Sequence, residues 1–148
     1  MANSKALGID DISGFEFTKE MLKGDYTYGI NFDRVQWDAK HNKYIIVELL
    51  LCDESQNVSP FTSHPNRYFH KNSQKFISLW DLSQKMGALL YLVNYAKKGT
   101  RHADKILFMR VKGVDKSDTI SPVKTENFEM TREQFSNAFR GMNARGKK

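Results

Sequence analysis

The chain has 148 residues, of which 40% are hydrophobic and 12% aromatic, so it is long enough for one substantial core and too apolar to be disordered. Its formal charge of +6 favours a polyanionic partner, and its single cysteine excludes an internal disulfide. A membrane-spanning run and a signal-peptide core are both lacking, so we expect a cytoplasmic protein. We predict one domain over residues 1–148, with flexible ends at 1–14 and 143–148.

The first regular elements are predicted between residues 18 and 37. Thr18 is expected to cap a short helical turn. Apolar residues then alternate over 26–37, which indicates a strand, and the alternation slips by one position at Asp33 and Arg34. A β-bulge produces such a slip, and bulges often re-aim side chains beside active sites. Asp33 is therefore a candidate functional carboxylate, and a surface bulge without a role is the alternative.

Residues 44–52 form the most apolar stretch of the chain, which is typical of an inner strand covered on both faces. The polar residues 38–43 are predicted to turn the chain into an antiparallel hairpin. Glu48 lies in the middle of the run, and a buried carboxylate must be neutral, paired with Lys or Arg, or bound to a metal. Two interpretations stay open: a structural carboxylate, ion-paired or at the exposed end of the strand, and a functional one.

Residues 53–72 show no periodicity, and a loop of this length in a compact domain is usually functional or disordered. Phe61, Tyr68 and Phe69 argue against disorder. They alternate with basic side chains, as in surfaces that stack bases and contact phosphates, and the alternative is a loop held to the core by its aromatics. The candidate nucleic-acid-binding residues, here and in the basic segment 97–102, are Arg67, Tyr68, His70, Lys71, Lys97, Lys98 and Arg101.

A helix is predicted over residues 73–86, with Gly87 as its stop, followed by strands over 88–96 and 105–114 that form a hairpin. Residues 115–130 are polar and turn-rich, and a capping box beginning at Thr131 predicts a last helix. The order β-β-α-β-β-α defines an α+β fold, with helices packed on one mixed sheet. A right-handed crossover makes its second and third strands parallel.

Asp33 at the bulged strand, Glu48 in the next strand, and the helix and strand that follow are together similar to the core of the PD-(D/E)xK nuclease superfamily. The resemblance implies that Asp33 and Glu48 hold Mg²⁺ or Mn²⁺, which polarises a phosphate and lowers the pKa of bound water. The motif's proline is absent, and Leu50 stands where its lysine is expected. Some members supply that lysine from the neighbouring helix, here Lys75 or Lys85.

The sequence therefore predicts a metal-dependent nuclease-like protein acting on DNA or RNA, or an inactive descendant of one. Its catalytic residues would be Asp33, Glu48 and Lys75, with Asp33 and Glu48 as the metal ligands. The alternative is a non-catalytic basic protein that binds nucleic acid or an acidic protein surface. Nucleic acid is the partner that the charge favours first.

Overall fold

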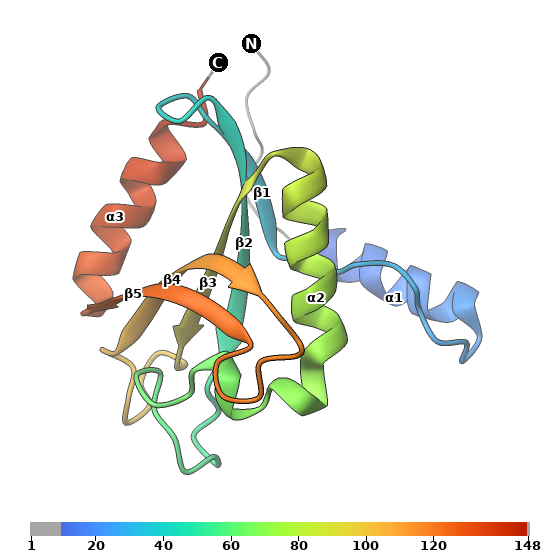
Figure 1. Ribbon diagram of the computed structural model, residues 1–148, viewed down its shortest axis with the longest axis horizontal. Helices are drawn as coiled ribbons and strands as arrows, with labels where there is room; N and C mark the ends of the chain where they lie inside the picture. The colour runs from blue at the N-terminus through green and yellow to red at the C-terminus, as the bar shows by residue number, and fades with distance from the viewer. Residues whose placement is uncertain (1–9, 148) are drawn as a thin grey trace. The chain divides into compact units, whose positions relative to one another are not determined.

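The computed structural model describes residues 10–147, and its contacts divide the chain after Ile30 into two units. The first unit contains helix α1 (Asp10–Leu22), drawn in blue in Figure 1. This helix is longer than the predicted turn. Thr18 lies inside it and does not cap it, because the Thr18 hydroxyl donates a hydrogen bond to the carbonyl oxygen of Gly14 at 3.0 Å.

The second unit folds around one five-stranded sheet in the order β1-β2-β3-β4-β5, with α2 and α3 on opposite faces (Figure 1). Strands β2 and β3 are parallel, and all other neighbours are antiparallel. These pairings confirm the predicted α+β fold, both hairpins and the parallel return after a helix. The elements are β1 (Arg34–Asp38), β2 (Lys43–Leu51), η1 (Pro65–Arg67), α2 (Phe69–Met86), β3 (Leu89–Tyr95), β4 (Ile106–Val114), β5 (Val123–Met130) and α3 (Arg132–Ala144).

Strand β2 is the inner strand that its apolar run predicts. Ile45, Ile46 and Val47 have no exposed surface, because helices cover both faces of the sheet here. Ile46 belongs to the core beneath α2, together with Phe76. Ile45 and Val47 belong to the core beneath α3, together with Met142. Burying an aliphatic side chain of this size contributes about 1.5–3 kcal/mol, so this strand stabilises the packing of both α2 and α3 on the sheet.

Strand β1 is shorter than predicted and contains no bulge. Residues 26–33 are not in a strand, and β1 begins only at Arg34, opposite Val47. Asp33 explains this boundary, because its Oδ2 accepts a hydrogen bond from the backbone N–H of Leu49 at 2.8 Å. In a longer β1 a backbone carbonyl would accept such a bond. The alternation before Asp33 therefore does not reflect strand pairing.

Helix α2 begins at Phe69, earlier than the predicted start at residue 73. Asn72 departs from helical geometry, with φ −131° and ψ 21°, so the first turn is kinked relative to the rest. Gly87 ends the helix in the left-handed conformation with φ 63°, as predicted. Within residues 10–147, no helix is both long and apolar enough to cross a membrane.

Strand β5 lies in residues that the sequence predicts to be polar turns. It is an edge strand that backbone pairing holds to β4, and Val123 is its one buried residue. The capping box of α3 is confirmed, because Thr131 and Gln134 each accept a hydrogen bond from the other's backbone N–H. In the predicted flexible tail, Arg145 Nε lies 3.1 Å from the buried Asp38. Residues 1–9 and 148 lie outside the described residues.

Candidate functional site

Glu48 lies on the face of β2 that α2 covers, and only 5% of its surface is exposed. Two polar side chains contact it. Lys75 of α2 places its Nζ 3.3 Å from Glu48 Oε2. Asp33, immediately before β1, is hydrogen-bonded to the Glu48 carboxyl group. The three residues that were predicted to be catalytic therefore lie together, although they come from three separate parts of the chain.

The Glu48 carboxyl group holds its proton unusually tightly. Burial is the largest cause that raises its pKa from 4.5 to about 8, followed by the hydrogen bond with Asp33. The positive charge of Lys75 lowers the pKa, and the negative charge of Asp33 raises it again. With a pKa of about 8, Glu48 is mostly protonated at neutral pH and shares a hydrogen bond with Asp33. The contact with Lys75 becomes a full ion pair only when Glu48 ionises.

Only one of the two candidate lysines reaches the carboxylates. Lys75 contacts Glu48, whereas Lys85 pairs with Asp81 of the same helix at 3.0 Å. The Lys75 side chain is 40% exposed, so water can solvate its charge whether or not Glu48 is ionised. Lys75 is thus the ion-pair partner that the sequence allowed for Glu48. Because Lys75 is partly exposed, its charge does not depend on Glu48 for compensation.

The donor set of this cluster suits a hard divalent cation. Within residues 10–147, no three or more His, Cys, Asp and Glu side chains are grouped so that they could hold a metal ion. Asp33 and Glu48 supply two carboxylates, and Mg²⁺ commonly binds one or two carboxylates and takes its other ligands from water and substrate phosphate. The same pair does not suit zinc, which needs three or four protein ligands.

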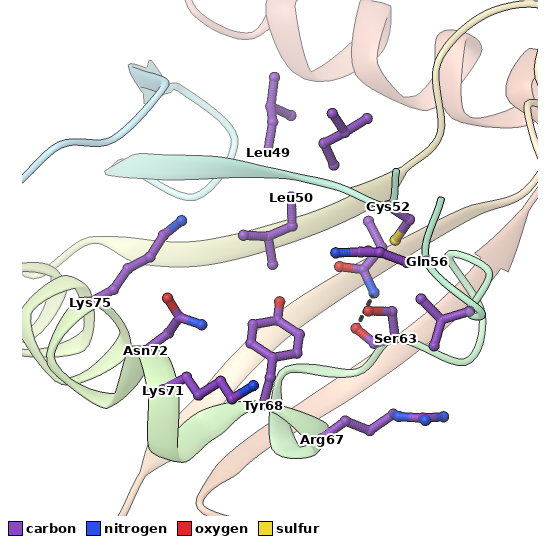
Figure 2. Close-up of a pocket in the computed structure, with 13 residues that line it drawn as sticks. Leu49, Leu50, Cys52, Gln56, Ser63, Arg67, Tyr68, Lys71, Asn72 and Lys75 are labelled. Carbon is purple, nitrogen blue, oxygen red and sulfur yellow. Dashed lines mark hydrogen bonds between the residues drawn. The ribbon is translucent and has the colours of Figure 1, made fainter. Parts of the chain in front are cut away.

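A cavity of about 510 Å³ adjoins the cluster at the carboxyl ends of the parallel strands β2 and β3 (Figure 2). Sheets with parallel strands often bind ligands at this end. Lys75 lines the cavity and also contacts Glu48, so it connects the two features. The polar lining near α2 and β3 comes from Arg67, Tyr68, Lys71, Asn72, Lys75 and Asn94.

The predicted nucleic-acid-binding residues divide into two groups in the structure. Arg67, Tyr68 and Lys71 line the cavity. The other four are exposed and do not line it: His70, Lys97, Lys98 and Arg101. The first group therefore adjoins the carboxylate cluster, and the second group extends the basic surface to the α2 surface and the loop between β3 and β4.

Residues 53–72, which were predicted to be one loop, are anchored by some of their side chains, and Phe69 lies at the start of α2. Phe69 is 3% exposed and stacks on Phe76 with ring centroids 6.3 Å apart, so its ring is not free to stack on a base. The Asn66 side chain bonds both backbone groups of Val123 in β5. Tyr68 also packs against the core, but it lines the cavity as well. The anchored-loop interpretation therefore holds for Phe69.

Sequence reasoning missed Asn94, which lies in the apolar strand β3 and has no exposed surface. Asn94 pairs with Leu50 in the sheet, so it shares a face with Glu48. The sequence signal that could have identified Asn94 is the same as for Glu48, namely a polar residue inside an apolar run.

A second buried carboxylate, Asp38, lies at the opposite end of β1 from Asp33. Burial raises the pKa of Asp38, but hydrogen bonds from His41, Arg145 and the backbone N–H of Lys40 outweigh it, and the net pKa is lowered. These bonds join the end of α3 to the turn between β1 and β2. We interpret Asp38 as a structural residue.

Comparison of the chain with known protein families, with characterised proteins and with solved structures gave no match. The fold class defined by the structure is an α+β domain, and fold class does not determine activity.

Proposed function

We propose that this protein is a metal-dependent phosphodiesterase that acts on DNA or RNA. The observation that carries the proposal is the meeting of Asp33, Glu48 and Lys75 beside a cavity with a basic lining. Lys75 reaches from α2 to the carboxylate of β2, and so supplies the cation that is missing at Leu50 in the resemblance to PD-(D/E)xK nucleases. That resemblance supports the proposal without replacing the geometry.

The carboxylate pair would hold Mg²⁺ or Mn²⁺. Two carboxylates that share a proton repel each other when both ionise, and a divalent cation removes that repulsion. Asp33 Oδ2 accepts the backbone N–H of Leu49, which fixes the orientation of this carboxylate. Rigid, pre-oriented carboxylates are what a divalent site requires of its protein ligands.

Each residue then has a defined task. When bound, the divalent ion polarises the phosphate and lowers the pKa of a bound water. Asp33 and Glu48 hold the ion, and Lys75 keeps Glu48 oriented and presents a positive charge to the phosphate. Arg67 and Lys71, along the same cavity, bind the polyanionic backbone next to the scissile bond.

The test is cleavage of labelled single- and double-stranded DNA and RNA in Mg²⁺ or Mn²⁺. Glu48→Gln and Asp33→Asn should each lower the rate by more than about 100-fold, since even second-shell partners of metal ligands are worth about 10–100-fold. Lys85→Ala is the matched control, because Lys85 lies on α2 in an exposed pair with Asp81. Cleavage that persists in both carboxylate variants would refute the assignment.

A second candidate is a non-catalytic basic protein that binds nucleic acid or an acidic protein surface. One observation favours it: Lys75 and a raised pKa are enough to explain a buried Glu48 without any metal. On this account the wild type binds nucleic acid with a strong salt dependence but cleaves nothing in Mg²⁺ or Mn²⁺. Binding without cleavage would select this candidate.

A further inference from the structure

The cavity beside Lys75 contains a fixed and unsatisfied hydrogen-bond acceptor. Asn94 lines the cavity and is fully buried. Its Nδ2 donates to the carbonyl oxygens of Pro60 and Ser63, at 3.0 and 2.9 Å. Figure 2 marks the bond to Ser63 with a dashed line. Both amide hydrogens are thus used, and the amide group cannot turn.

The Oδ1 atom of Asn94 has no hydrogen-bond partner among the described residues, and it is the only such buried side-chain atom in that part of the chain. In a planar amide, Oδ1 points away from the two carbonyls that Nδ2 binds. Buried acceptors are nearly always satisfied, and an unsatisfied one calls for an explanation. A ligand that donates an N–H group to Asn94 would satisfy it.

The rest of the cavity has the chemistry of a nucleotide site. Its volume of about 510 Å³ falls within the range of small-ligand pockets, about 300–1,000 Å³. Leu50 and Val58 supply apolar walls, and Lys71 and Lys75 supply positive charge. A nucleotide joins a flat apolar base with N–H donors on its edge to an anionic phosphate. Lys75 would contact that phosphate and also touches Glu48.

We propose that this cavity holds one unpaired nucleotide, whose base donates an N–H group to Asn94 Oδ1 and whose phosphate lies against Lys71 and Lys75. In a duplex the base is stacked between its neighbours and cannot enter a cavity, so the base must be unpaired or flipped out to be read in this way. The inference rests on the proposed function and deepens it, because it makes the substrate single-stranded or locally unpaired. Asn94 Oδ1 has almost no exposed surface, so part of the cavity lining has to move aside before the base reaches this atom.

The main test changes the ligand, and two protein variants serve as controls. Binding of three fluorescent ten-residue oligonucleotides to the wild type is measured in EDTA, where metal-dependent cleavage cannot occur. The base of the first oligonucleotide is cytosine, that of the second is N4-methylcytosine, and that of the third is N4,N4-dimethylcytosine. Cytosine has its edge donors on N4 alone, so the dimethyl base has none, while the monomethyl base keeps one donor and controls for bulk.

We expect the dimethyl oligonucleotide to bind about tenfold more weakly or worse, and the monomethyl one to bind within about threefold of cytosine. A duplex of the same length should bind more weakly than the single strand. Lys71→Ala should weaken binding of all three oligonucleotides, and Lys85→Ala should not. Equal affinity for cytosine and its dimethyl derivative would overturn the inference and leave a bound water as the partner of Asn94.

This result is distinguishable from failure of the proposed function. If the dimethyl oligonucleotide binds more weakly but the wild type cleaves nothing in Mg²⁺ or Mn²⁺, the nucleotide site stands and the phosphodiesterase proposal fails. If Asp33 and Glu48 prove essential for cleavage but the three oligonucleotides bind equally, the catalytic proposal stands and the nucleotide site fails.

Discussion

Replacement of Glu48 by Gln should remove a large part of the pH dependence of stability. In the folded protein the pKa of Glu48 is about 8, against 4.5 for the ordinary carboxyl group. Between these values the folded state binds one more proton than the unfolded state. The stability that Glu48 contributes is therefore fully present below pH 4.5 and is lost as the pH rises through the folded pKa. One proton corresponds to a slope of about −1.4 kcal/mol per pH unit.

Glutamine keeps the size of the side chain and can still donate to Asp33, but it does not titrate. The free energy of unfolding of the wild type, minus that of Glu48→Gln, should thus fall by about 2–3 kcal/mol between about pH 5 and 7. Urea unfolding in EDTA, followed by tryptophan fluorescence at several pH values, measures this difference. Titration of Asp38 and His64 cancels, because both proteins contain these groups.

The control is Glu126→Gln, which neutralises an exposed carboxylate on the edge strand β5. Its unfolding curve should follow the wild type across the whole pH range. The reasoning about Glu48 is refuted if the Glu48→Gln and wild-type stabilities stay parallel from pH 5 to 8. If the free energy of unfolding of Glu48→Gln is lower than that of the wild type by the same amount at every pH, the ionised carboxylate and Lys75 form a stabilising ion pair.

Three further outcomes are expected. Mg²⁺ or Mn²⁺ at tenfold its dissociation constant should stabilise the wild type by about 1.4 kcal/mol in urea melts, and should leave Asp33→Asn unchanged. Joint replacement of Lys97 and Lys98 by Ala should reduce the slope of log affinity for nucleic acid against log salt concentration by up to about 2, measured by fluorescence anisotropy. An unchanged slope would mean that nucleic acid binds elsewhere. Arg145→Ala should cost about 1–3 kcal/mol by urea unfolding, because the buried Asp38 loses a charged donor, and an unaltered midpoint would contradict that role.

The sequence was most informative where one physical signal dominated. The unbroken apolar run around Glu48 predicted an inner strand, because only a strand covered on both faces tolerates such a run. Gly87 and the capping box at Thr131 predicted helix ends correctly, since both depend on local backbone chemistry. The candidate site followed from the same signal, a single carboxylate in an apolar strand.

Long-range contacts set the limits of sequence reasoning. The alternation that ends at Asp33 looked like a strand, but strand pairing also needs a neighbour, and the Asp33 side chain takes the N–H of Leu49 instead. Strand β5 was missed because its sequence is mostly polar, with Val123 as its one buried residue, and it is held by backbone pairing with β4. That Lys75 rather than Lys85 reaches Glu48 depends on how α2 lies over the sheet, which periodicity does not determine.

We propose that Asp33 and Glu48 together bind a divalent cation. The most direct measurement is anomalous diffraction from a crystal soaked in Mn²⁺ at a pH above 8, where Glu48 ionises. We expect one strong anomalous peak bonded to an oxygen of each carboxylate, with the remaining ligands from water. An anomalous map with no peak there, and with Glu48 still bonded to Lys75, would contradict the account and leave Glu48 as a structural ion-pair partner.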